Sequence, residues 1–479
     1  MTAKSVMVLG TTSGAGKSWL ATALCRWYAR QGLKVAPYKA QNMSNNARVV
    51  PGLDGRMGEI GSAQYFQALA ARRVPEVRMN PVLLKPEADT QSQVVVLGEV
   101  DAALSRMPWR ERSAALWPRA EAALHALMAE NEVVVIEGAG SPAEINLAAG
   151  DYVNLGSARA SRAACLLVTD IDRGGAFAHL YGTHQLMPAD VRAQLRGFVL
   201  NRFRGDAALL APGPEQLQAL TGVHTVATLP MWRGHGLPEE DGVFDDGATG
   251  AGLRIAVIAY PRLSNLDEFQ PLRQLPGVRL SWARTPQDVA GADLLILPGS
   301  KSTAADLAWL RAQKLDAAIN AHAGPILGIC GGLQMLGEAL IDTEGVDGNA
   351  PGLGLLPLVT AFEARKLLRD TALTFESLDG PWAALSAVQA RGYEIRHGRT
   401  QPHPALPPPR VALRNAEGEA IGWQSGRVLG IYAHGLFEQP AVLQALFGQA
   451  PPPLDAVFDG LADFIDRHFM PGTLQQLIA

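Results

Sequence analysis

Near the amino end of the chain, glycines, hydroxyl side chains and a lysine are grouped in the run Gly10–Ser18, which reads Gly-Thr-Thr-Ser-Gly-Ala-Gly-Lys-Ser. Small residues let backbone N–H groups surround a polyanionic phosphate at the start of a helix. Lys17 would supply a point charge to the terminal phosphates, and the Ser18 hydroxyl is suited to bind Mg²⁺. The run therefore predicts a P-loop that binds the phosphates of a nucleotide. Its candidate residues are Gly10, Thr11, Thr12, Ser13, Gly14, Gly16, Lys17 and Ser18.

The spacing of this loop departs from the usual P-loop at one position. The glycine expected five residues before the Gly-Lys pair is replaced by Thr11, and the leading glycine is Gly10. This spacing resembles the dethiobiotin-synthetase-like branch of P-loop proteins rather than the kinases or GTPases. A dinucleotide-binding loop does not fit, because no third glycine follows Gly14 and Gly16 in register.

An acidic residue, Glu137, directly follows the apolar run Val133–Ile136. At the carboxyl end of a strand in a P-loop domain, a carboxylate is well placed to hold Mg²⁺, directly or through water. We therefore predict that Ser18 and Glu137 are the protein's ligands to this metal. Polar clusters at residues 38–46 and 169–175 also follow predicted strands. Ligands bind at this edge of open α/β sheets, so both clusters are expected near the nucleotide.

A second site is indicated by the sequence Gly-Ile-Cys-Gly-Gly at residues 328–332, between a predicted strand at 325–329 and a predicted helix at 331–340. This is the Gly-x-nucleophile-x-Gly elbow, with Cys330 as the nucleophile. A helix start favours the thiolate form of the cysteine. The N–H of Gly331 can then face an oxyanion, and Gly299, in a second turn of small residues, is the candidate for the other donor. Cys25 and Cys165 lie in a predicted helix and strand, where a free cysteine is usually a small buried hydrophobe.

The nucleophile needs a base, and the second half of the chain offers several histidines. The candidates are His322, His397, His403, His434 and His468. His434 ends the apolar run Leu429–Ala433 and precedes a glycine, which is a better catalytic position than a proline-rich loop or a terminal helix. We therefore predict that Cys330 and His434 form a catalytic pair.

The elements that must position these residues are short apolar runs alternating with helical patterns, as in buried parallel sheets. Such runs recur at residues 5–9, 133–136, 165–169 and 197–200, and again at 254–259, 293–297 and 325–329. Between the two groups, residues 234–252 hold six glycines and five acidic residues, which is typical of a linker. We predict an α/β protein with a P-loop domain at 1–233 and a second α/β domain, which carries the nucleophile elbow, at 253–479. An amphipathic pattern after residue 453 predicts a terminal helix docked on the second domain.

Composition excludes several classes of protein. The chain has 479 residues, 48% of them hydrophobic and 18% charged, with a formal net charge of −4. That balance gives no electrostatic footprint for nucleic acid. Three separated cysteines exclude a disulfide scaffold. No apolar run approaches the roughly 20 residues that span a bilayer, and no signal peptide is visible at the start. We therefore expect a cytoplasmic protein without membrane or nucleic-acid partners, and self-assembly into a homo-oligomer stays open.

Taken together, these motifs resemble the cobyrinate-type glutamine amidotransferases, in which a P-loop synthetase is fused to a class I glutaminase. The segments at 328–337 and 433–437 carry the likeness to the glutaminase part. Others resemble the cobyric acid synthase branch in particular, and they lie at residues 38–46, 80–86, 170–176, 201–205 and 297–303. The resemblance covers essentially the whole chain.

The resemblance implies amidation of the b, d, e and g carboxylates of adenosylcobyrinic acid a,c-diamide, with ATP and glutamine as co-substrates and a corrinoid as acceptor. Two positions depart from the family pattern. Where many class I glutaminases carry a glutamate two residues after the histidine, this chain has Leu436, so a third catalytic member is unassigned. Where Gly-Tyr-Glu-Ile-His is expected at 392–396, the last residue is Arg396 and the histidine follows as His397.

Three alternatives compete with this interpretation. The nearest is a cobyrinic acid a,c-diamide synthetase or another amidoligase, against which the Asn-rich segment 38–46 argues. A ParA- or MinD-like ATPase switch would share the P-loop but would leave Cys330 and His434 unexplained. A pure glutaminase subunit would leave the first domain unexplained.

Overall fold

A six-stranded parallel sheet forms the first half of the chain in the computed structural model, which describes residues 3–88, 91–238 and 252–479. In spatial order its strands are β12 (Thr225–Pro230), β11 (Leu195–Phe203), β10 (Ala164–Asp170), β1 (Lys4–Gly10), β9 (Val133–Glu137) and β2 (Val35–Tyr38). Successive residues of a strand face opposite sides. Val6 and Val8 of β1 therefore pack on one face, while Met7 and Leu9 pack on the other.

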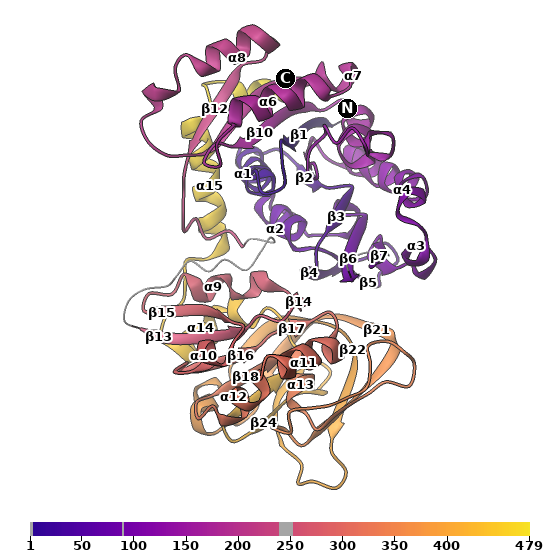
Figure 1. The fold of residues 1–479 in the computed structure, drawn as a ribbon, viewed down its shortest axis with the longest axis vertical. Helices are drawn as coiled ribbons and strands as arrows, with labels where there is room; N and C mark the ends of the chain where they lie inside the picture. Colours follow the sequence, from indigo (N-terminus) through magenta and orange to yellow (C-terminus); the bar gives the residue numbers. More distant parts are fainter. Residues whose placement is uncertain (1–2, 89–90, 239–251) are drawn as a thin grey trace.

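Helices cover both faces of this sheet. The helix α1 (Lys17–Arg30) packs on the face of Val6 and Val8, whereas α4 (Trp109–Glu130) and α6 (Ala176–Leu186) cover the other. A smaller sheet lies beside this core, with β3 (Gln41–Met43), β6 (Val82–Ala88), β7 (Gln91–Val96) and β8 (Glu99–Val100). A hairpin of β4 (Ala47–Pro51) and β5 (Met57–Gly61) precedes α2 (Ser62–Ala70). The smaller sheet and the hairpin both lie toward the second half of the molecule (Figure 1).

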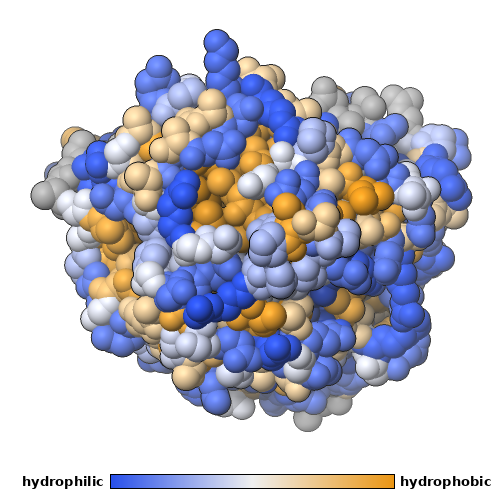
Figure 2. Space-filling view, turned by 90° about the horizontal axis from the view of Figure 1, so that it is seen from below, coloured by the Kyte–Doolittle hydropathy of each residue, from blue (hydrophilic) through white to orange (hydrophobic). Residues whose placement is uncertain are grey.

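The second half is built on an eleven-stranded mixed sheet. Its parallel part runs β15 (Val278–Ala283), β13 (Leu253–Ile258), β16 (Leu294–Leu297), β18 (Ile326–Ile329) and β25 (Val428–Ile431). The sheet continues through antiparallel strands, with β24 (Ala420–Ser425), β23 (Arg410–Asn415), β21 (Leu358–Phe375) and β22 (Gln389–Pro402). The long strands β21 and β22 contact the β4–β5 hairpin of the first half. Seen from below, the surface is largely hydrophilic, with apolar patches between the polar side chains (Figure 2).

These elements confirm the predicted α/β class and the strands predicted for both halves. The helix after Cys330 was predicted too long. The helix α13 ends at Leu336, because Gly337 takes an extended conformation, and β19 (Ala339–Ile341) then joins the sheet beside β21. Most of the predicted linker at 234–252 lies outside the described residues. Within the part of the chain that is described, no helix has the length and apolar character needed to cross a membrane.

The predicted docking of the terminal helix on the second domain is wrong. The helix α15 (Leu454–His468) packs beside α1 on the first sheet, as Figure 1 shows. Its apolar residues Phe458, Leu461 and Ile465 join the hydrophobic core that holds Val6 and Val8. The chain therefore crosses to the second half and returns to the first.

Candidate active site

The glycine-rich loop joins β1 to α1, as predicted, and its lysine folds back over it. Lys17 Nζ donates hydrogen bonds to the carbonyl oxygens of Thr12 at 2.9 Å and Gly140 at 3.1 Å. Asn201 fixes the loop from β11, which lies beyond β10 in the sheet, since its Nδ2 donates to the Ala15 carbonyl at 2.9 Å. The loop is therefore held in shape by the sheet around it.

A cavity of about 560 Å³ lies at this loop. The predicted residues that line it are Ser13, Gly14, Gly16, Lys17 and Ser18. Gly10, Thr11 and Thr12 do not line it. Thr11 is buried, and its hydroxyl donates to Thr169 Oγ1 at 2.9 Å, so it supports the base of the loop. Both predicted polar clusters reach the cavity, through Lys39, Gln41 and Asn42 from one and Arg173 from the other.

Glu137 sits in the wall of the same cavity and accepts several hydrogen bonds. Its Oε1 accepts from Ser18 Oγ at 2.8 Å and from Lys39 Nζ at 2.7 Å, and its Oε2 accepts from Gln67 Nε2 at 2.6 Å. Burial opposes ionisation of the carboxyl group, but Lys39 and the hydrogen bonds outweigh it and hold the pKa of Glu137 below its usual range. Glu137 is therefore a carboxylate at neutral pH.

Ser18 and Glu137 are brought together as the sequence predicts, and their oxygens suit Mg²⁺. Among the described residues there is no cluster of three or more His, Cys, Asp or Glu side chains that could hold a metal. An ion at this place would therefore take most of its ligands from phosphates and water, which is the usual way that Mg²⁺ binds with a nucleotide.

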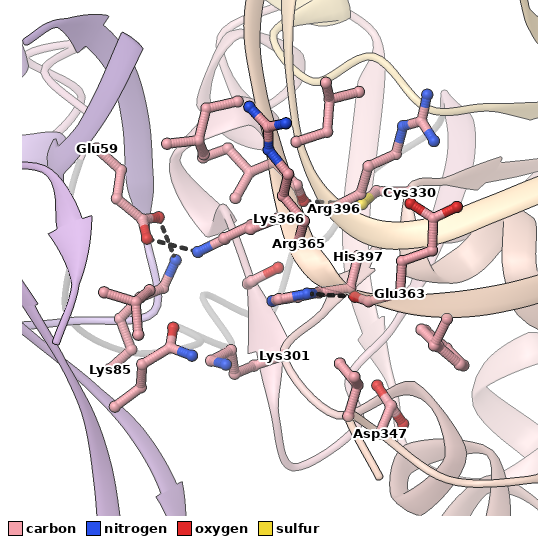
Figure 3. A pocket seen from close by; sticks show the side chains of 18 of the residues that line it. Glu59, Lys85, Lys301, Cys330, Asp347, Glu363, Arg365, Lys366, Arg396 and His397 are labelled. Atoms are coloured by element: carbon pink, nitrogen blue, oxygen red, sulfur yellow. Dashed lines mark hydrogen bonds and ion pairs between the residues drawn. The ribbon is translucent and has the colours of Figure 1, made fainter. Parts of the chain in front are cut away.

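Cys330 stands at the sharp turn between β18 and α13 (Gly331–Leu336). Its backbone has φ 51° and ψ −104°, a strained conformation for a residue with a side chain. Such strain is typical of a nucleophile elbow, which pushes its side chain out of the sheet. The thiol lies 3.6 Å from the Ile395 carbonyl oxygen and lines a cavity of about 1010 Å³ (Figure 3).

His434 is held between Cys330 and an acidic residue that the sequence did not reveal. Its Nδ1 lies 3.1 Å from Glu268 Oε1, and it lines the same cavity as Cys330, which favours the protonated imidazole. Glu268 comes from the 3-10 helix η5 (Leu266–Phe269), and its Oε2 accepts from the Gly435 N–H at 3.1 Å. Burial alone would lower the pKa of His434, but Glu268 and Cys330 outweigh it and raise the pKa to about 10. The three residues thus form a nucleophile, a protonated imidazole and an orienting carboxylate.

Glu268 occupies the role that Leu436 cannot fill. It belongs to an Asp-Glu pair without a recognisable motif, well before the nucleophile in the sequence. Only the fold brings η5 against the turn after β25, so no local signal could have identified it.

The two glycines predicted as oxyanion donors lie close to the catalytic pair. A Cβ added to Gly299 would lie 2.8 Å from His434 Cε1, and a Cβ added to Gly331 would lie 2.8 Å from the Ser300 nitrogen. Both positions are therefore too crowded for a side chain. Their role as N–H donors to an oxyanion stays a prediction.

The second departure from the family pattern also has a structural account. Arg396 Nε donates to Glu394 Oε2 at 2.6 Å, and its guanidinium lies 3.9 Å from the centre of the Tyr432 ring. His397 faces the cavity of Cys330, where burial lowers its pKa to about 4 (Figure 3). His397 is thus a neutral imidazole in the cavity wall, and the neighbouring Arg396 is held by Glu394 and by the Tyr432 ring.

Both halves of the chain line the cavity at Cys330. From the first half come Glu59 of β5 and Lys85 of β6, joined by an ion pair of 2.8 Å. Lys366 of β21, in the second half, pairs with the same carboxylate of Glu59 (Figure 3). Burial lowers the pKa of Lys366 to about 7, against the opposing effect of Glu59. The cavity at Cys330 is thus closed on one side by the nucleotide-binding half.

A P-loop domain and a Cys-His-Glu site in one chain define a synthetase fused to a glutamine amidotransferase. Family models support both parts. Residues 6–235 match the CobQ/CobB/MinD/ParA nucleotide binding domain, and residues 254–442 match the CobB/CobQ-like glutamine amidotransferase domain.

Curated relatives identify the branch of these amidotransferases to which the chain belongs. The chain is 72% identical to "Cobyric acid synthase" of Methylibium petroleiphilum, over 100% of this chain and 97% of that protein. It is 69% identical to the protein of the same name from Variovorax paradoxus, over 100% of both chains. Among solved structures, PurLQS from Thermotoga maritima aligns with 41% of this chain and 98% of its own at 19% identity, with a TM-score of 0.32. The chain belongs to the cobyric acid synthase family and is a glutamine-hydrolysing ligase.

Proposed function

We propose that this protein uses ATP and glutamine to amidate the b, d, e and g carboxylates of adenosylcobyrinic acid a,c-diamide. The observation that carries the proposal is the presence, in one chain, of a P-loop cavity and a Cys330–His434–Glu268 site. Full-length identity of 69–72% to proteins named cobyric acid synthase supports the choice of the corrinoid.

At the P-loop cavity, the chemistry begins with activation of a carboxylate, which is a poor electrophile. ATP transfers its γ-phosphoryl group to the carboxylate oxygen, giving an acyl phosphate and ADP. Lys17 supplies positive charge to the terminal phosphates. Ser18 and Glu137 would hold Mg²⁺, which neutralises charge on the phosphates when bound. Ammonia then attacks the acyl carbon and displaces phosphate, leaving the amide.

At the other site, the thiolate of Cys330 attacks the amide carbon of glutamine. Protonated His434, oriented by Glu268, gives its proton to the departing ammonia. The N–H groups of Gly331 and Gly299 would stabilise the oxyanion. Water, deprotonated by His434, hydrolyses the thioester to glutamate and restores the thiolate.

The proposed domain boundaries are 1–233, a linker at 234–252, and 253–479. The family matches at 6–235 and 254–442 support them. The helix α15 belongs to the second domain by sequence but packs with the first.

A panel of corrinoid acceptors tests the proposal. With ATP and glutamine, the enzyme should amidate adenosylcobyrinic acid a,c-diamide as far as cobyric acid, as followed by mass spectrometry. Amidation of cobyrinic acid only as far as the a,c-diamide would instead identify a cobyrinic acid a,c-diamide synthetase.

A further inference from the structure

Arg48 is a buried arginine of the nucleotide-binding half that inserts between two acidic residues of the glutaminase half. It lies on β4, is 1% exposed, and pairs with Asp267 of η5 and Glu438 of η7 (Leu436–Glu438). Its guanidinium carbon also lies 5.1 Å from the centre of the Tyr393 ring. A planar guanidinium fixes two carboxylates and a ring in a way that a lysine cannot.

These three partners of Arg48, all from the second half of the chain, adjoin the catalytic residues. Asp267 directly precedes Glu268, and Glu438 lies one turn after His434 and Gly435. The ring of Tyr393 stacks on the imidazole of His434, with centroids 5.4 Å apart and an interplanar angle of 24°. Arg48 therefore touches the supports of both His434 and Glu268, while touching neither residue's reacting atoms.

Neighbours of Arg48 hold the same supports through hydrogen bonds. Asn46 Oδ1 accepts from the Leu266 N–H at 2.8 Å, at the start of η5. Asn265 Nδ2 donates to the Ala47 carbonyl at 2.9 Å and to the Tyr393 hydroxyl at 2.6 Å. The segment 46–48 thus fixes η5, the element that carries Glu268.

The segment that carries Arg48 starts at the nucleotide cavity. Asn42 lines that cavity and stands four residues before Asn46, a stretch that spans at most about 13 Å. The helix α2 makes a second connection. Its Gln67 donates to Glu137 at 2.6 Å, while its Phe66 ring lies 5.0 Å from the Arg48 guanidinium carbon. The support of the glutaminase site is therefore anchored at the ATP site.

We propose that Arg48 is a positioning residue for glutamine hydrolysis, supplied by the synthetase domain, which holds Glu268 and His434 in their working geometry. The inference rests on the proposed function, because it assumes that glutamine is hydrolysed at Cys330. It assigns part of the glutaminase machinery to a domain that carries none of the catalytic triad.

The test compares full-length Arg48→Ala and Arg48→Lys with the wild-type enzyme. Glutamate release gives kcat and KM for glutamine hydrolysis, and amide synthesis from concentrated ammonium chloride reports on the other site. A misplacement of about 1 Å can cost about 100-fold in rate. We expect Arg48→Ala to lose about 10- to 100-fold in kcat for glutamine hydrolysis, and Arg48→Lys to recover part of that loss. In both variants, the KM for glutamine and the rate of ammonia-dependent synthesis should stay within about twofold of wild type.

A matched control is Arg26→Ala. Arg26 is also 1% exposed, pairs with Asp455 and Asp459, and lies 5.4 Å from the Phe458 ring, but it joins α1 to α15. Arg26→Ala should lower the stability of the protein, but it should not lower kcat for glutamine hydrolysis more than it lowers ammonia-dependent synthesis. A folded Arg48→Ala enzyme that keeps the wild-type kcat for glutamine hydrolysis overturns the inference, as does an equal loss of both activities in the Arg48 variants. If Arg48→Ala does not fold, a wild-type kcat in folded Arg48→Lys overturns it. Cys330→Ala distinguishes a failure of this inference from a failure of the proposed function, because full glutamine hydrolysis in that variant would overturn the proposed function itself.

Discussion

At the scale of single residues, Glu268 decides how the glutaminase site works. Burial alone would favour a neutral His434, and Glu268 is the largest of the effects that oppose burial and keep a proton on the imidazole for the departing ammonia. The elbow around Cys330 and the glycine after His434 could be found in the sequence, because their constraints are local. Glu268 could not, because its role depends on a contact between η5 and a turn far along the chain.

Glu268→Gln should lower kcat for glutamine hydrolysis by about 10²- to 10⁴-fold, since a neutral amide no longer stabilises the imidazolium. Ammonia-dependent synthesis should stay near the wild-type rate, because it does not use this site. Assays of glutamate release and of synthesis with ammonium chloride check both statements. A Glu268→Gln enzyme that hydrolyses glutamine normally would remove Glu268 from the catalytic site.

The interaction between His434 and Glu268 predicts how the stability of the fold depends on pH. The pKa of His434 is raised to about 10 in the folded protein, against about 6.5 in the unfolded chain. A raised pKa stabilises the fold fully below about pH 6.5, and that contribution disappears as the pH rises towards 10. The difference in melting temperature between wild type and Glu268→Gln should therefore be largest near pH 6.5 and shrink towards pH 10. A difference that grew with pH would contradict the assigned direction.

Glu137→Gln should raise the Mg²⁺ concentration needed for half-maximal ammonia-dependent synthesis by about tenfold or more. The charge that would hold the ion is removed, while the shape of the side chain is kept. The control is Gln67→Leu, which removes a hydrogen bond of 2.6 Å to the same carboxylate but keeps its charge. An unchanged Mg²⁺ titration in a folded Glu137→Gln enzyme would remove Glu137 from the metal site.

At the scale of elements, the phosphate loop was the most predictable part of the structure. Strand, loop and helix are consecutive, so their order and composition are visible in the sequence. What the sequence could not reveal is the support from β11, where Asn201 presses against the loop. A Cβ added to Gly16, at φ 99°, would lie 2.1 Å from Asn201 Nδ2.

Gly16→Ala should therefore deform the loop and weaken ATP binding at least about tenfold, or about 1.4 kcal/mol, as measured by titration calorimetry. Gly32→Ala is the matched control at the other end of α1. Gly32 has φ 83° but has nothing within 4 Å of an added Cβ. Both variants carry a left-handed strain of roughly 1–2 kcal/mol, but only the first meets a neighbour. Equal ATP affinities for the two variants would argue against the support from Asn201.

At the scale of the whole molecule, the helix α15, near the carboxyl end of the chain, returns to pack on the first half. The sequence predicted that α15 is amphipathic and therefore buries one face, which is correct. It could not predict the partner, because an apolar stripe fits any apolar surface of matching shape. The sheet face beside α1 is that surface, and Tyr28 of α1 also donates to the Leu474 carbonyl at 2.8 Å.

Phe458→Ala should therefore destabilise the first half of the molecule, at a cost of about 3–5 kcal/mol for a buried phenylalanine. Hydrogen exchange followed by mass spectrometry should show faster exchange in α1, with β18 and α13 unchanged. Phe375→Ala, an equally buried change in β21, should give the opposite pattern. Faster exchange confined to the second half in Phe458→Ala would contradict the docking of α15.

The central claim is a division of labour, in which Cys330 makes ammonia and the P-loop domain uses it. The most direct measurement follows amidation of adenosylcobyrinic acid a,c-diamide by Cys330→Ala, with ATP and either ¹⁵N-amide glutamine or ¹⁵N-ammonium chloride, by mass spectrometry. Wild type should incorporate ¹⁵N at the b, d, e and g positions from either source. Cys330→Ala should incorporate it only from ammonium, since the acyl phosphate needs no thiol. Incorporation from glutamine by Cys330→Ala at the wild-type rate would mean that ammonia arises elsewhere, and the two-site account would fail.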